Sequence, residues 1–490
     1  MRIRRIIGAA ALVFVMGGIV RGQGSGGFRQ GMQGTPAADP AVSASRTPAA
    51  DSGGSQNAFL GGIPSGQATG EELPLSLSET IQRGLEHNLG TVLSEQSLRA
   101  ARGVRMLALS QMLPKVTAGL NEMQQQVNLA AFGFQGYPGM RTVVGPFNVF
   151  DVRAYISQTV LDLSLWNRYH AEKENVKAAE FSRENARDMV VFVCSNLYLQ
   201  TVADQSRIDA VRAQVKTARV LYDLAVDQKE AGVVPAIEVL RAQVELQAQQ
   251  QRLIVAEDQF AKDKLALARA IGLPIGQEFR LTDPMTFAPL PEASLDDIVQ
   301  RAYRERPDYQ GAQARVRAAE SSRKAARAGR LPTINFTADY GDIGQRPWTS
   351  HGAFAVTTNL RFPIFQGGSV RARVEEADAL LRQREAELED LKARIYYEVR
   401  TALLDLEAAA ERVRVAQSAN RLAQEQVAQS EDRFRAGVTN NVEVVQAQEA
   451  LATASENYIA SLQAHSAAKL ALAKAMGISE EEYISFLRGQ

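Results

Sequence analysis

The side chains that could perform catalysis or bind a metal are few and far apart. The chain has one cysteine and four histidines in 490 residues. No histidine has a second one at ligand spacing, and the shared helix face of His170 and Glu174 is more typical of a surface contact. Cys194 lies in the apolar stretch VVFVCSNLYL and is expected to be a small core residue. The sequence therefore predicts neither an enzyme nor a metal or cofactor site.

Two glutamates occupy matching places in a stretch that occurs twice. EAGVVPAIEVLRAQV (230–244) and RAGVTNNVEVVQAQE (435–449) contain Glu238 and Glu443, each six residues after the glycine of an Ala-Gly-Val tripeptide. A carboxylate in the first turn of a helix complements the helix dipole, whereas several carboxylates gathered around one axis attract cations. The choice between these roles depends on the elements that position the glutamates.

The repeated stretch belongs to a tandem duplication. Residues 76–114 align without gaps with 294–332, and eleven of 39 positions are identical. Residues 231–272 align with 436–477, and sixteen of 42 positions are identical. Both halves have the same order of elements: a helix, two alternating segments, a very long helix and a further helix.

The N-terminal region is predicted to lie outside the duplication. Arg2, Arg4 and Arg5 precede the apolar run Ile6–Val20, and small residues follow it. This pattern is typical of a secretory signal peptide, with an uncleaved anchor as the alternative. The predicted segments are a signal peptide (1–22), a flexible Gly/Ser/Pro-rich leader (23–72), a first repeat (73–273), a linker (274–293), a second repeat (294–478) and a short tail (479–490).

The alternating segments have the period of β-strands. In the second half, four bulky apolar residues share one strand face and are predicted to face lipid: Phe354, Val356, Leu360 and Phe362. Alternation over about ten residues is typical of membrane barrel strands. A soluble hairpin with one wet face is the alternative.

Very long helices follow the strands. Leu165–Glu230 and Ser369–Arg435 contain no proline, and at 1.5 Å per residue each would extend about 100 Å. Gly232 and Gly437 are expected to end these helices as left-handed caps.

The shorter helices Glu79–Met112 and Pro235–Ile271 together match one long helix in length. We expect them to stack end to end along it, with the strand hairpin at one end and the glycine turn at the other. Because four strands cannot close a barrel, the chain is expected to assemble with copies of itself.

The chain resembles the TolC family of outer-membrane efflux channels over about residues 73–478. RERPDYQGAQARVRAAE (304–320) is similar to the helix start of that family, and LRFPIFQGGSVRARVEEA (360–377) to its strand-to-helix junction. The resemblance implies a mainly α fold with a membrane β-barrel portion, assembled as a trimer with twelve strands and a helical tunnel in the periplasm. It further implies outer-membrane lipid, a periplasmic adaptor protein and an inner-membrane pump as partners.

The expected function is a passive exit duct for efflux or type I secretion, and a periplasmic coiled-coil spacer without a pore is the alternative. Lysine plus arginine and aspartate plus glutamate both number 55, so no basic excess indicates a nucleic-acid partner.

The resemblance also implies functional residues at the turns. Two acidic residues of the family motif commonly narrow the periplasmic entrance; they correspond to Glu443 and Gln446, of which only the first is acidic. Glu238 is the first-half equivalent of Glu443, and a plain helix-start role is the alternative for both. The implied adaptor contacts, for which plain helix caps are the alternative, are Gly232, Val233, Gly437 and Val438.

Overall fold

The computed structural model describes residues 58–133, 141–289, 294–436, 438, 441–478, 482–483 and 486. The predicted signal peptide, most of the predicted leader and most of the predicted tail lie outside the described residues. The proposed domain boundaries remain predictions.

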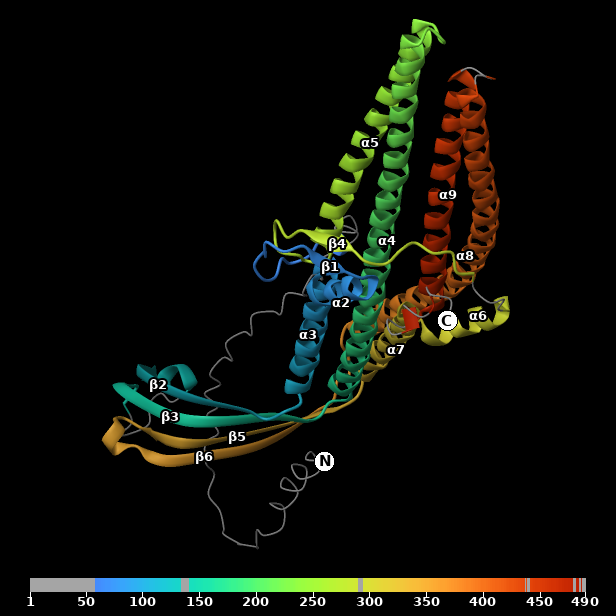
Figure 1. Cartoon of the computed structure of the whole chain (residues 1–490). Coiled ribbons are helices and arrows are strands. Elements are labelled where there is room, and N and C mark those ends of the chain that lie inside the picture. The colour runs from blue at the N-terminus through green and yellow to red at the C-terminus, as the bar shows by residue number, and fades with distance from the viewer. Residues whose placement is uncertain are drawn as a thin grey trace. The chain divides into compact units, whose positions relative to one another are not determined.

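The described fold is predominantly helical, as predicted (Figure 1). Its helices are α2 (Leu77–His87), α3 (Leu89–Ser110), α4 (Leu163–Glu230), α5 (Ala236–Ala270), α6 (Leu295–Glu305), α7 (Pro307–Ala328), α8 (Ser369–Arg435) and α9 (Asn441–Met476), with short 3-10 turns η1 (Leu129–Phe132) and η2 (Pro347–Thr349). The strands are β1 (Leu73–Leu75), β2 (Lys115–Asn128), β3 (Val143–Leu161), β4 (Phe279–Leu281), β5 (Thr333–Gly344) and β6 (His351–Arg361).

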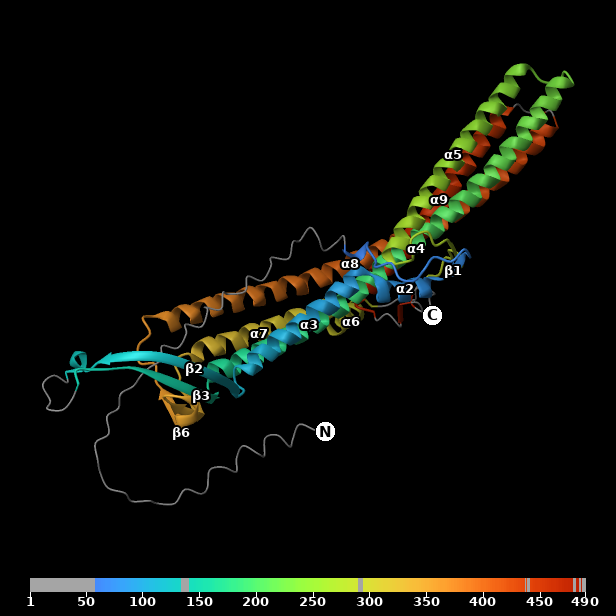
Figure 2. The same ribbon diagram turned by 90° about the vertical axis from the view of Figure 1, so that its left-hand side faces the viewer.

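The two long helices were predicted almost to the residue. Helix α4 has 68 residues and α8 has 67. Helices α3 and α5 pack along α4, whereas α7 and α9 pack along α8. The two halves also interlock, because α7 packs against α4 as well as α8 and α9 contacts α4. Figures 1 and 2 show the last residues of α4 and α8 and the first residues of α5 and α9 at the end away from the sheet.

The four long strands form one antiparallel sheet in the order β2-β3-β5-β6. Each hairpin comes from one half, and the pairing of β3 with β5 joins them. Directly opposed residues point to the same face. Two rows of apolar residues therefore cross all four strands on one face: Val116–Ile156–Ala338–Val356 and Ala118–Ala154–Tyr340–Phe354.

The predicted single helix Glu79–Met112 is wrong, because the chain breaks at Asn88 into α2 and α3. Asn88 has an extended backbone with ψ 137° and caps α3 by accepting from the Gly90 amide. Its side-chain amide donates to the carbonyls of Phe59 at 2.7 Å and Ala270 at 2.9 Å. These hydrogen bonds stabilise the break in the helix. Their partners are distant in sequence, so no local sequence pattern reveals them.

Arg306 occupies the equivalent break between α6 and α7. It is buried, and its guanidinium donates to Asp308, to Glu398 of α8 at 2.7 Å and to the carbonyl of Ala475 at 3.3 Å. Burial by itself lowers the pKa of Arg306, but the carboxylates of Asp308 and Glu398 raise it above its ordinary value. Arg306 therefore fixes α7, α8 and α9 to one another.

Glycines end α5 and α9 at equivalent positions beside these breaks. Gly272 has φ 63° and Gly477 has φ 70°, a conformation that favours glycine. A Cβ at Gly272 would lie 2.7 Å from the Cβ of His87, and one at Gly477 would lie 2.9 Å from the Arg306 nitrogen. The same close approach of helix end to helix break thus occurs in both halves.

Part of the predicted flexible leader is held in place. The amide of Ile63 donates to the His87 carbonyl at 2.8 Å, and that of Ser65 to the Gly272 carbonyl at 3.2 Å. The phenyl ring of Phe59 packs over Gly90, where a Cβ would lie 2.4 Å from it. The prediction was wrong for these residues because the composition of the leader hides contacts made by single side chains and by the backbone.

Candidate functional site

The turn between α4 and α5 is a left-handed cap, as expected. Gly232 has φ 74°, its amide donates to Lys229, and the amide of Val233 donates to Gln228 at 2.8 Å. In the second half the Val438 amide donates to Arg433 at 3.0 Å, whereas Gly437 lies outside the described residues. The side chains of Val233 and Val438 are 68% and 69% exposed.

Glu238 lies in the first turn of α5 and is largely buried. Its Oε1 accepts from Arg241 of the same helix at 2.6 Å. Its Oε2 is buried and has no hydrogen-bond partner among the described residues. The carboxylate is thus held at the tip with one oxygen bonded and the other buried without a hydrogen bond to the described residues.

Glu443 lies in the first turn of α9 and pairs with a different element. Its Oε1 is 3.0 Å from Nη1 of Arg433, which belongs to the end of α8. This ion pair crosses the turn between the two helices. Gln446, the third predicted gate residue, is exposed one turn further along α9.

The arginine that pairs with the glutamate occupies a different position of the repeat at each of the two tips. By the alignment of the repeats, Arg241 corresponds to Gln446, and Gln228 corresponds to Arg433. Each glutamate therefore has one arginine, supplied from its own helix in the first half and from the preceding helix in the second. The predicted carboxylate gate is in each chain a set of carboxylate–guanidinium pairs.

Below the tips, the two helical hairpins meet in an apolar cluster. Leu221 of α4 packs with Phe434 of α8 and Val444 of α9, and Leu224 lies beside them. The cluster places the ends of α8 and α9 against α4.

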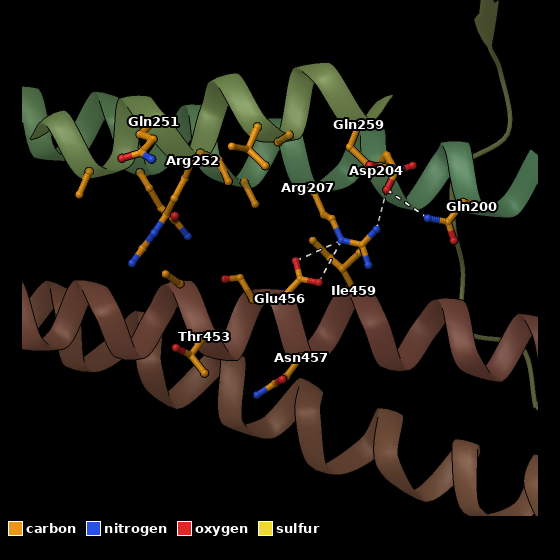
Figure 3. Close-up of a pocket in the computed structure, with 18 residues that line it drawn as sticks. Gln200, Asp204, Arg207, Gln251, Arg252, Gln259, Thr453, Glu456, Asn457 and Ile459 are labelled. Carbon is orange, nitrogen blue, oxygen red and sulfur yellow. Dashed lines mark hydrogen bonds and ion pairs between the residues drawn. The ribbon is translucent and has the colours of Figure 1, made fainter. Parts of the chain in front are cut away.

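A groove of about 840 Å³ lies further from the tips, lined by α4, α5 and α9. Arg207 of α4 reaches across it, as Figure 3 shows, and its Nε donates to both carboxylate oxygens of Glu456 on α9 at 3.0 and 3.1 Å. Nη2 of Arg207 donates to Gln463 of α9 at 3.2 Å. One arginine thus ties the two hairpins together by hydrogen bonds and charge.

Asp204 bonds to Arg207 on the same helix and has a raised pKa. Its Oδ1 accepts from Arg207 Nη1 at 2.6 Å, while its Oδ2 is buried without a partner among the described residues. Burial and the neighbouring carboxyl of Asp263 raise the pKa of Asp204 to about 6, although Arg207 opposes the rise. The pKa of Asp263 is lowered: its burial acts against this direction, and its interactions with Asp204, Gln259 and Gln200 outweigh it.

The sheet places three of the four predicted lipid-facing residues on its apolar face: Phe354, Val356 and Leu360. Phe362 lies one residue beyond the end of β6, so its assignment to the strand was wrong. The ladder ends at the pair Thr333–Arg361, because β5 begins at Thr333 and offers no partner to residue 362.

A sequence profile of the family described as "Outer membrane efflux protein" matches residues 81–273 and 298–478. The chain belongs to the outer membrane efflux protein family. This assignment agrees with the resemblance found in its sequence.

Curated relatives of this efflux protein include the probable efflux pump outer membrane protein TtgC of Pseudomonas putida. It is 26% identical over 82% of this chain and 83% of the relative. The pyoverdine export outer membrane protein OpmQ of Pseudomonas aeruginosa is 24% identical over 82% of this chain and 85% of the relative. The crystal structure of the CmeC outer membrane channel of Campylobacter jejuni has a similar fold, with a TM-score of 0.72 and 17% identity over 82% of this chain and 85% of CmeC.

The efflux protein is therefore an outer-membrane efflux channel by family rather than an enzyme, and its fold is that of a solved outer-membrane channel. Membership of a channel family favours the predicted duct over the alternative of a spacer. None of its described helices has an apolar stretch long enough to cross a bilayer.

Sequence reasoning missed the residues that connect the hairpins of the efflux protein. Arg207 and Glu456 are 249 positions apart, and neither belongs to a motif. The partner of Glu238 could have been predicted from the sequence, because Arg241 follows it at helical spacing. The partner of Glu443 could not, because Arg433 reaches it only across the turn between two helices. Cys194 is a buried core residue as predicted, and burial raises its pKa to about 12.

The raised pKa of Asp204 gives the efflux protein a pH-dependent stability. Because the folded pKa of about 6 exceeds the ordinary aspartate value of 3.8, this group stabilises the fold most below about pH 4 and loses that contribution as pH rises through 6. The substitution Asp204→Asn removes the titration. The wild-type free energy of unfolding, relative to Asp204→Asn, should therefore be about 1 kcal/mol greater at pH 5 than at pH 7.5.

Urea unfolding followed by helical circular dichroism measures this difference, and Asp209→Asn on the exposed surface of the same helix is the control. An equal gap at both pH values would contradict the assignment of the titration to Asp204.

Proposed function

We propose that three copies of this chain form one channel whose twelve strands close a barrel in the outer membrane. The observation that carries the proposal is the four-stranded sheet with an apolar face and two open edges, β2 and β6. Unpaired backbone groups at such edges cost several kcal/mol each in hydrocarbon, so the edges require partners. The apolar face contacts lipid in this assembly, and the opposite face lines the lumen.

Exposed apolar seams on the helices support the same assembly. Large apolar side chains recur at coiled-coil spacing on solvent-facing sides of α5 and α8. Neighbouring copies would cover them: Ile237, Leu240, Val244, Ile254 and Leu265 on α5, and Tyr397, Leu404, Val415 and Leu422 on α8.

The detergent-extracted protein is expected to have a mass about three times that of the processed chain, whose precursor is 53.4 kDa. Light scattering coupled to size exclusion, corrected for bound detergent, distinguishes three copies from two or four. A monodisperse monomer that retains its β-signal in circular dichroism would exclude the assembly.

We further propose that Glu443 and Glu238 narrow the periplasmic entrance and that cations bind there. Three copies bring six glutamates to the tips, and rings of carboxylates bind cations. Arg433 and Arg241 partly neutralise these carboxylates. The glutamates therefore repel one another less, and attract cations less, than six unpaired carboxylates would.

Opposite charge changes in the Arg433–Glu443 pair should change divalent-cation block in opposite directions. Glu443→Gln leaves the charge of Arg433 and should weaken magnesium block of planar-bilayer conductance about threefold, whereas Arg433→Gln should strengthen it. Glu449→Gln, exposed on the same helix, is the matched control. If Glu443→Gln and the double variant with Glu238→Gln match wild type, these residues only complement helix dipoles.

We propose that the tips contact a periplasmic adaptor, through which an inner-membrane pump delivers cargo. Val233 and Val438 are exposed apolar residues at equivalent places in the two turns, next to the left-handed caps. The efflux and pyoverdine-export names of the two relatives support small organic molecules as cargo over proteins.

An aspartate at the tips should prevent adaptor docking without closing the channel. Val233→Asp with Val438→Asp removes two apolar contacts and is expected to lower adaptor affinity about tenfold. Efflux in cells that carry the cognate adaptor and pump should fall, while bilayer conductance stays normal. Val220→Asp, exposed lower on α4, is the control, and an equal loss there would count against a tip contact.

A further inference from the structure

The polar face of the sheet carries an ion-pair cluster at the seam between the two halves. Arg153 of β3 donates through Nε to Asp151 Oδ1 at 2.6 Å and through Nη1 to Asp339 Oδ1 of β5 at 2.9 Å. Its Nη2 donates to the second oxygen of Asp151. All three side chains are at least three-quarters covered, so the cluster is held in one arrangement.

A glycine on the neighbouring strand β5 makes room for Arg153. The register opposes it to Gly119 on β2 and to Gly341 on β5. A Cβ at Gly341 would lie 2.7 Å from Cγ of Arg153. The absence of a side chain there lets the guanidinium lie across β5 and reach Asp339.

The cluster lies on the face that lines the lumen in the proposed assembly. Arg153, Asp151 and Asp339 alternate with the apolar rows on these strands, so they lie on the opposite face of the sheet. In the assembly, three copies would place three clusters at one level of the barrel.

We propose that Arg153, by neutralising one of the two aspartates in each cluster, sets the preference of the barrel lumen between cations and anions. This inference rests on the proposed trimer. With arginine present, each cluster carries one excess negative charge; without it, two carboxylates face the lumen. Fixed charges on a pore wall concentrate counter-ions, and this effect is largest when the Debye length is long.

The other charged groups on this face are few among the described strand residues. Lys115 and Arg361 are at the strand ends next to the helices. His351 lies two strands from Asp151 in the same cross-strand row, because both are in register with Ile343. Arg361 therefore provides a matched control, since Arg361→Gln removes the same charge from the same face at another level.

The test measures reversal potentials in planar bilayers across a potassium chloride gradient near 0.1 M. Arg153→Gln should raise the cation-to-anion permeability ratio about twofold or more, and Asp339→Asn should lower it. Arg361→Gln should change it less. Each variant is also measured with Glu238→Gln and Glu443→Gln, so that the entrance carboxylates do not dominate.

The outcomes separate this inference from the assembly that it requires. Trimeric variants of normal conductance with the wild-type reversal potential overturn the selectivity role and leave the assembly intact. An equal effect of Arg361→Gln also overturns it, because total charge rather than the cluster then decides. If Arg153→Gln fails to insert, Asp339→Asn, which retains the packing of Arg153, gives the result by its opposite sign.

Discussion

The free edges of the four-stranded sheet constrain everything else in this chain. Edges β2 and β6 present N–H and C=O groups that pair with no strand in the described part of one copy, and hydrocarbon offers no partner. Four strands are too few to curl until the edges meet. In the proposed assembly, the helices that continue from these strands stand beside those of neighbouring copies, which would cover the large apolar residues left exposed along α5 and α8.

Regular patterns in the sequence predicted the long elements well. The proline-free stretch Ser369–Arg435 became α8 without a change of boundary, because nothing inside it interrupts helical hydrogen bonding. Alternation of apolar and polar residues predicted the apolar strand face, because successive side chains of a strand point to opposite faces. The break at Asn88 and the ordered residues around Phe59 were missed, because both depend on partners in α5 or beyond the repeat. Arg207 and Glu456 are distant in sequence, and only the packing of α4 against α9 brings them together.

The duplicated halves keep the same geometry with different chemistry. At the helix breaks, the amide of Asn88 reaches the Ala270 carbonyl, and the guanidinium of Arg306 reaches the equivalent carbonyl of Ala475. At the tips, arginine and glutamine exchange places around Glu238 and Glu443. The equivalent backbone carbonyl at the helix break therefore accepts a side-chain hydrogen bond in each half. The side chain that donates it is neutral in the first half and charged in the second.

Strand β1 pairs in parallel with β4, which lies about two hundred residues later and just before the second half begins. Tyr198 and Asp283 reinforce the pair, because the tyrosine hydroxyl bonds to both Leu75 and Asp283, and Asp283 accepts from the Leu77 amide. Every group in this clasp belongs to the first half or the segment after it. No residue of the second half is needed to close this clasp. The duplication therefore leaves the two ends of the first half joined by contacts of their own, separate from those that join it to the second half.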